Sequence, residues 1–165
     1  MDEDYMKFLG NLDYYLSTEL RFIDPHKGRY YSKRMARSNC EITYPVGVLG
    51  DIEVWFIHYQ SEEEAKKKWE RRIRRFEKIN NDNILIKWSE RYDYGEEHLK
   101  KFIELPFKHK IAFVTPILKK KFQNYDYVIS IPELEFLNIR GGDETESINQ
   151  HFDVLKLINS LNNKD

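Results

Sequence analysis

The feature that most constrains the fold is an alternation of short apolar runs with amphipathic stretches from residue 52 onward. Ile52–Tyr59 is aromatic and β-branched, as is typical of a buried strand. Ser61 follows it, and Glu64 stands three residues later, so the pair predicts a capped helix start. Apolar residues then recur at helical spacing, at Ala65, Trp69, Ile73 and Phe76. A strand followed by a helix predicts the first half of a βαβ unit.

The alternation continues toward the C-terminus. Further strands are predicted over Ile84–Trp88, Ile111–Val114 and Tyr127–Ile131. Helices are predicted over Glu96–Leu105, Lys119–Phe122 (a short helix or turn) and Glu146–Leu161. Because helices join successive parallel strands, the sequence predicts one α/β domain over residues 1–165. We expect three layers, with a mostly parallel sheet of four or five strands flanked by helices.

The segment before residue 52 has a different pattern. Glu3–Leu20 carries apolar residues at spacings of three and four, which predicts one helix. Pro25 and Gly28 mark a turn. The basic stretch 29–40 shows little apolar pattern and is expected to be a loop, a short irregular helix or a binding segment. Tyr44–Asp51 is rich in turn residues and reads as a lead-in to the first strand.

Composition narrows the class of protein. Charged residues make up 33% of the chain, yet the formal net charge is −1, so no global attraction to nucleic acid or anionic membranes is expected. The single cysteine, Cys40, cannot form an internal disulfide, which favours a reducing compartment such as the cytoplasm. The acidic start Met1–Asp4 is unlike a secretory signal, and no apolar run approaches the roughly 20 residues of a membrane span. We predict no metal site.

Several stretches together resemble one bacterial family. They are Tyr44–Gly47, Asp51–Glu53, Phe56–Tyr59, Ser61–Ala65, Lys68–Arg72 and Ile79–Asn83, with Asp4–Phe8, Leu12–Leu16, Phe102–Phe107 and Lys110–Phe113 on either side. They cover about residues 4–115 and are similar to domain of unknown function 1919. Its members are often described as exopolysaccharide biosynthesis proteins, and some as acetyltransferases. The resemblance implies a cytoplasmic bacterial protein that transfers an acyl or glycosyl group to a sugar or nucleotide-sugar precursor.

The resemblance has one departure with a functional consequence. Members of the family usually begin with an earlier strand that carries a motif near Asn-Cys-Trp-Gly-Gly, and the present sequence has no such segment. Its absence favours an alternative, a non-catalytic module that binds carbohydrate or a partner protein. Neither the resemblance nor the residues identify a cofactor or an oligomeric state.

Polar residues at strand ends are the first candidates for a site, because ligands of open α/β sheets bind beyond the carboxyl ends of parallel strands. This rule selects His58 and Tyr59 after the first predicted strand, and Glu90 and Arg91 after the second. Histidine has an unperturbed pKa of about 6.5 and can take a proton from a sugar hydroxyl at neutral pH. His58 is therefore the predicted catalytic base. The alternative is a histidine hydrogen-bonded within the sheet.

Three acidic or amide side chains, Asp51, Asp82 and Asn83, stand in predicted turns. Asp51 precedes the same strand and would lie about 23 Å from His58 if the interval were fully extended, so we expect it to cap a turn. Asp82 and Asn83 could bind a sugar or a metal, and we predict the sugar. Their alternative role is to end the preceding helix and form a turn.

The run Lys66–Lys78 holds eight basic and two acidic residues. Arg71 and Arg72 are the members we predict to bind substrate, since a guanidinium grips phosphate through two hydrogen bonds. The run also raises an alternative function, nucleic-acid binding. A charged run can equally be a solvated helix face. The sequence contains no phosphate loop, nucleophile elbow, zinc-protease motif or dinucleotide-binding fingerprint.

Overall fold

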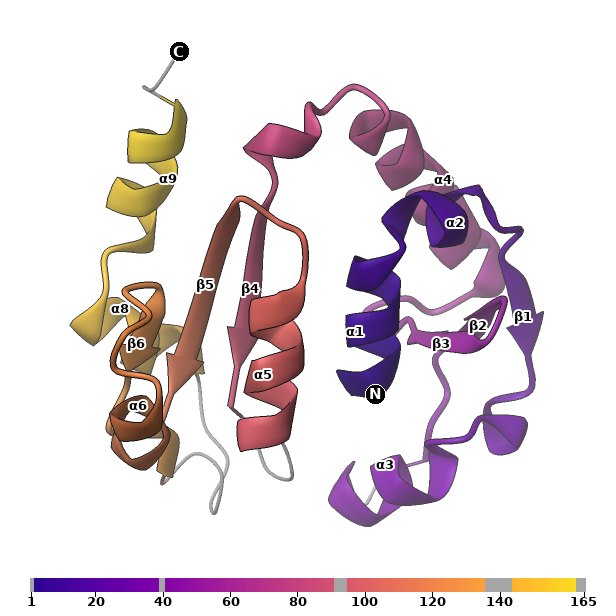
Figure 1. Cartoon of the computed structure of the whole chain (residues 1–165). Helices are drawn as coiled ribbons and strands as arrows, with labels where there is room; N and C mark the ends of the chain where they lie inside the picture. The colour runs from indigo at the N-terminus through magenta and orange to yellow at the C-terminus, as the bar shows by residue number, and fades with distance from the viewer. Residues whose placement is uncertain (1, 39–40, 91–94, 136–143, 163–165) are drawn as a thin grey trace. The chain divides into compact units, whose positions relative to one another are not determined.

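The computed structural model describes residues 2–38, 41–90, 95–135 and 144–162 (Figure 1). The chain divides into two compact units, Met1–Ile79 and Asn80–Asp165. Each has its own sheet, and each is described by itself.

The sheet of the first unit is antiparallel. It contains β1 (Arg21–Ile23), β2 (Val46–Leu49) and β3 (Ile52–Trp55) in the order β1-β2-β3. β2 and β3 form a hairpin in which Leu49 is opposite Ile52, so the loop is only Gly50 and Asp51. Gly50 has φ 58°, a left-handed conformation that glycine adopts without steric cost.

Four helices belong to the described part of this unit, together with a short 3-10 turn, η1. The helices are α1 (Asp2–Gly10), α2 (Leu12–Ser17), α3 (Tyr31–Ser38) and α4 (Glu62–Phe76), and η1 is Pro25–Lys27. Tyr15, Leu49 and Ile52 form a buried cluster against which Phe8 and Trp69 pack. The hairpin is thus covered by side chains from both ends of the unit's sequence.

The predicted single helix over Glu3–Leu20 is interrupted. Asn11 has φ −148° and ψ 58°, so α1 ends at Gly10 and α2 begins at Leu12. Glycine and asparagine are among the residues that most readily leave helical geometry, and here they stand together. At α4 the prediction is confirmed: the Ser61 hydroxyl accepts a hydrogen bond from the backbone N–H of Glu64 at 3.2 Å.

Two strands of the first unit, β1 and β2, were not expected. Val46–Leu49 lies within the predicted turn-rich lead-in, yet it forms the central strand of the sheet. Gly47 stands in this strand because a Cβ there would lie 2.5 Å from Leu20 and 3.0 Å from Phe56. The predicted strand over 52–59 is also shorter, since β3 ends at Trp55.

The second unit contains the expected parallel strands. β4 (Leu85–Ser89), β5 (His109–Val114) and β6 (Val128–Ser130) pair in sequence order. The intervening helices are α5 (Glu96–Glu104) and α6 (Pro116–Lys121). Two helices, α8 (Glu144–His151) and α9 (Val154–Asn162), follow, and the 3-10 turn η2 (Asn81–Asn83) precedes β4.

This parallel sheet carries helices on both faces. Alternate side chains of a strand point to opposite faces. Phe113 therefore belongs to the cluster with Ile148 of α8, whereas Trp88 lies on the other face with its ring centroid 6.3 Å from that of Phe102 in α5. The helix predicted over 146–161 is divided after His151, and the Asp153 carboxylate accepts the N–H of Lys156 at 2.8 Å as α9 begins.

The expected fold class is thus confirmed as mixed α/β, but the expected sheet is not. Over the described residues, one unit has three parallel strands and the other has three antiparallel strands, rather than one mostly parallel sheet of four or five. The cause is the hairpin, because β3 pairs with the strand that immediately precedes it. The prediction that residues 1–165 form one domain stays a prediction.

Among the described helices, none combines the length and apolar character that crossing a bilayer requires.

The left-handed conformation of Gly50 yields a test of the hairpin. Gly50→Ala should lower the free energy of unfolding by about 1 kcal/mol, since a Cβ disfavours this conformation. Gly50→Asn is the matched control, because asparagine also adds a Cβ but tolerates left-handed geometry better. Urea unfolding of both variants should show the larger loss for alanine. Equal losses would mean that crowding against Tyr14, and not backbone strain, sets the cost.

Candidate ligand-binding site

A cavity of about 290 Å³ opens in the first unit. α1, β3 and α4 supply most of its lining, and α3 contributes one side chain. The lining residues are Asp4, Tyr5, Phe8, Arg34, Ile52, Glu53, Val54, Trp55 and Trp69. Four of these nine are aromatic and three are charged. This is the mixture found in small-molecule sites, where apolar walls give area and a few polar groups give orientation.

The aromatic lining is held by ring contacts that reach beyond the cavity. The ring centroids of Phe8 and Trp69 are 6.2 Å apart, and those of Trp69 and Phe56 are 6.5 Å apart in an edge-on arrangement. Such pairs stabilise a defined ring orientation. The wall formed by Trp69 is therefore fixed by α1 on one side and by the segment after β3 on the other.

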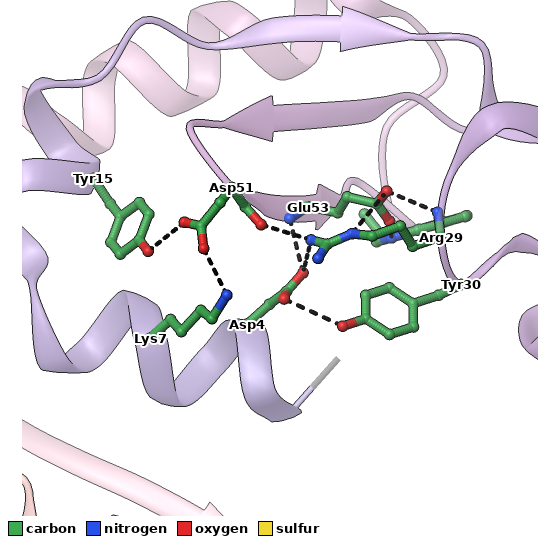
Figure 2. Close-up of polar contacts among 8 residues, drawn as sticks. Asp4, Lys7, Tyr15, Arg29, Tyr30, Asp51 and Glu53 are labelled. Atoms are coloured by element: carbon green, nitrogen blue, oxygen red, sulfur yellow. Dashed lines mark hydrogen bonds and ion pairs between the residues drawn. The ribbon is translucent and has the colours of Figure 1, made fainter.

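Asp4 is the most buried charge at the site, with 4% of its surface exposed. Its carboxylate accepts three hydrogen bonds: from Nη2 of Arg29 at 2.9 Å, from the hydroxyl of Tyr30 at 3.2 Å and from the backbone N–H of Glu53 at 2.9 Å (Figure 2). A buried carboxylate is tolerated only when it is paired and hydrogen-bonded. Asp4 meets both conditions.

Arg29 joins this carboxylate to the neighbouring one. Its Nη2 also donates to the backbone carbonyl of Asp51 at 2.8 Å, and its backbone N–H donates to Oε1 of Glu53 at 2.7 Å. The other oxygen of Glu53 accepts the indole N–H of Trp55 at 3.1 Å. Figure 2 shows Arg29 lying between the two carboxylates, with dashed lines to both. One guanidinium thus compensates two acids at the cavity wall.

A second polar contact ties the hairpin loop to the first two helices. The Asp51 carboxylate accepts from Nζ of Lys7 at 2.6 Å and from the hydroxyl of Tyr15 at 2.7 Å. The hydrogen bond from Lys7, followed by that from Tyr15, lowers the pKa of Asp51. Burial, followed by the bond to Asp51, raises the pKa of Tyr15 to about 12. The pKa of Tyr30 is also raised to about 12, by burial and then by the charge of Asp4.

The arrangement is suited to binding more than to proton transfer. The carboxylate of Asp4 already accepts three hydrogen bonds, one of them from the guanidinium of Arg29. In contrast, the indole N–H of Trp69 is buried and has no hydrogen-bond acceptor among the residues that the structure describes. A buried donor without an acceptor costs about 1–3 kcal/mol, and a ligand oxygen could remove that cost.

His58 and Tyr59, which were predicted to lie at a parallel strand end, follow β3 of the antiparallel sheet by three and four residues. β3 is antiparallel and ends at Trp55, so the rule for parallel strand ends does not apply to His58, and its premise was wrong. His58 is exposed in the turn before α4. Tyr59 accepts a hydrogen bond from Arg72 at 2.7 Å, and the guanidinium carbon lies 5.7 Å from the ring centroid. Arg71 is exposed on α4.

The other predicted residues belong to the second unit. Asp82 and Asn83 are exposed in η2, where the Asn80 side chain caps the turn and Asp82 lies 4.0 Å from Lys108. Glu90 accepts hydrogen bonds from both the backbone N–H and the hydroxyl of Thr115, at 2.7 and 2.9 Å.

Arg91 and Cys40 lie outside the described residues. The structure therefore brings Tyr59 to Arg72, while the site roles of all these residues stay predictions. Within the described ranges, no group of three or more metal-binding side chains is found.

Sequence reasoning did not select Asp4, Arg29 or Glu53. A signal was available for Asp4, because it stands four residues before Phe8 on the apolar side of the first helix. An acidic residue on a buried face requires a cationic partner. The identity of that partner could not be read locally, since Arg29 is 25 residues away.

Comparison with known proteins places the chain in a family. The model of the family called domain of unknown function (DUF1919) matches residues 1–160, and the chain belongs to that family. An uncharacterized protein of Haemophilus influenzae is 35% identical over 111 residues. The match covers 67% of the present chain but 45% of the relative, so the chain spans about half the length of that relative.

Removal of the buried carboxylate should destabilise the first unit. Asp4→Ala leaves the hydroxyl of Tyr30 and the N–H of Glu53 without their acceptor, and we expect a loss of about 2–3 kcal/mol in unfolding free energy. Glu3→Ala, an exposed neighbour on the same helix, should change it by less than about 0.5 kcal/mol. Urea titration measures both. A small effect of Asp4→Ala would contradict the central role of this carboxylate.

The raised tyrosine pKa values predict instability at high pH. A folded-state pKa above the unfolded value of about 10 stabilises the fold below pH 10, and this contribution is lost as the pH rises toward 12. Thermal melts between pH 9 and 12 should therefore show a falling midpoint. In the double variant Tyr15→Phe/Tyr30→Phe the fall should be shallower. An unchanged slope in that variant would show that other groups cause the alkaline transition.

Proposed function

We propose that the protein takes part in the biosynthesis of a bacterial exopolysaccharide or capsule, and that its first unit binds a sugar of the polymer or its cytoplasmic precursor. The family resemblance suggests the class of molecule, and the cavity supports binding of one sugar ring. The observation that carries the proposal is the aromatic lining of the cavity, which includes Trp69, whose buried indole N–H has no acceptor among the described residues.

The chemistry of the lining suits a saccharide. A sugar ring presents C–H groups on its faces, which pack on aromatic rings such as Phe8 and Trp69, and hydroxyl groups at its edge. Those hydroxyls are both donors and acceptors. They can donate to the remaining lone pairs of the Glu53 carboxylate and accept from Trp69.

The volume limits the size of the ligand. About 290 Å³ is at the lower end of the range for small-molecule sites, which is roughly 300–1,000 Å³. A single sugar ring suits such a space, whereas a whole nucleotide-sugar would extend into solvent. We therefore favour binding of one sugar unit, with any attached groups outside the cavity.

Transfer of an acyl or glycosyl group to the bound sugar is the second candidate. His58 is exposed and would serve as the base, but Asp4 and Glu53 are held by Arg29 and are better suited to positioning. If the transfer occurs, His58→Ala should abolish it without weakening sugar binding. This outcome would separate the catalytic proposal from the binding proposal.

The binding proposal is tested by titrating short neutral glycans into the purified protein. Trp69→Phe keeps an aromatic ring but removes the N–H, so affinity should fall by at least about tenfold. Trp88→Phe is the matched control, because its indole N–H also lacks an acceptor among the described residues but it lies against Phe102 in the second unit. Calorimetry or the shift of melting temperature measures binding. Equal losses in both variants, or no glycan bound by the wild type, would overturn the proposal.

A further inference from the structure

Five basic side chains form a stripe along the outer side of α4. They are Lys67, Lys68, Arg71, Arg74 and Arg75, and we call them the basic stripe. At 100° per residue they occupy one face of the helix, opposite Ala65 and Trp69 of the apolar face. From Lys67 to Arg75 the stripe is about 12 Å long at 1.5 Å per residue.

The stripe is narrow. Glu63, Glu70 and Glu77 lie along one flank of the helix, again at 100° per residue. On the other flank Arg72 is engaged by Tyr59 through a hydrogen bond of 2.7 Å. Between Lys67 and Arg75 the apolar residues are Trp69 and Ile73, and both belong to the face directed at the core. The stripe is therefore a line of cations without interleaved aromatic or apolar groups.

The cations of the stripe are not neutralised within the described part of the chain. No ion pair or hydrogen bond joins any of the five side chains to another described residue, whereas Lys7, Arg29 and Lys100 each pair with a carboxylate. Glu64 stands at the N-terminal end of a hollow of about 320 Å³ that it shares with four members of the stripe. Like charges at helical spacings of three and four repel each other, so an anionic ligand would stabilise α4.

We infer that the basic stripe binds an acidic polysaccharide, a linear polymer whose sugars carry carboxylate or phosphate groups. This inference rests on the proposed function and names the class of polymer. A flexible chain with spaced anions can follow a line of cations about 12 Å long. The three arginines can each hold a carboxylate or phosphate through two parallel hydrogen bonds.

Two other polyanions fit the stripe less well. Single-stranded nucleic acid is normally bound by cations together with aromatic rings that stack on bases, and the stripe presents none. A helix that lies on an anionic membrane directs apolar side chains into it, but those of α4 face the core. The formal net charge of −1 also means that a duplex or bilayer, which extends beyond the stripe, would meet repulsion elsewhere.

The test compares alginate, a polymer of uronic acids, with dextran, a neutral polymer, by calorimetry on the full chain. We expect alginate to bind more tightly and its affinity to fall as salt is added. Arg71→Glu/Arg74→Glu should weaken alginate binding at least tenfold. The matched control, Arg21→Glu/Lys27→Glu, makes the same charge change at exposed positions of the same unit and should alter affinity less than twofold. Circular dichroism checks that α4 remains folded.

Several results would overturn the inference. They are equal binding of alginate and dextran, an equal loss in the control variant, and duplex DNA or anionic vesicles that bind more tightly than alginate through the same arginines. The neutral-glycan titration separates this inference from the proposed function. The stripe variant should keep its affinity for a short neutral glycan at the Trp69 cavity. If wild-type protein binds alginate but no neutral glycan, the cavity proposal fails and the stripe stands.

Discussion

The ion pair between Arg29 and Asp4 is the contact on which the first unit depends. It joins α1 to the segment after η1, and the same guanidinium reaches the carbonyl of Asp51 in the hairpin loop. Asp4 and Arg29 are 25 residues apart in the sequence. Asp4 would be an uncompensated buried charge without Arg29, and Glu53 beside it would add a second. This guanidinium therefore helps to set the position of α1 against β3, together with the bond from the N–H of Glu53 to Asp4 and the ion pair of Lys7 with Asp51.

This dependence also decides what the cavity can do. A carboxylate that is held by a guanidinium has a fixed orientation, which suits it to receive the hydroxyl groups of a ligand. The carboxylates accept hydrogen bonds, whereas α4 carries hydrogen-bond donors on two of its sides. Trp69 lines the cavity, while the basic stripe on the far side of the helix presents cations to solvent. The two proposed sites, one for a sugar ring and one for a charged chain, would thus lie on opposite sides of the same helix.

Local patterns in the sequence were sufficient to predict much of the fold. β4, β5 and β6 and the helices α4 and α5 were predicted, because apolar spacing and the Ser61 cap are properties of neighbouring residues. Strand pairing is not such a property, and the antiparallel hairpin of β2 and β3 was therefore missed. The cluster of Asp4, Arg29 and Glu53 was missed for the same reason: its hydrogen bonds span 25 and 49 residues. Only the acid on an apolar helix face pointed to it.

The parallel strand ends of the second unit provide a useful contrast with the cavity of the first. Glu90 there accepts two hydrogen bonds from Thr115, and Ser89 donates to Glu144 of α8 at 2.5 Å. Glu133 pairs with His151 at 2.7 Å, and this hydrogen bond lowers the pKa of the carboxyl. The described polar groups at these ends satisfy one another, and a ligand would have to displace those bonds. The indole N–H of Trp69, in contrast, has no acceptor among the described residues, and this difference is the reason for proposing the sugar site at the cavity of the first unit and not at these strand ends.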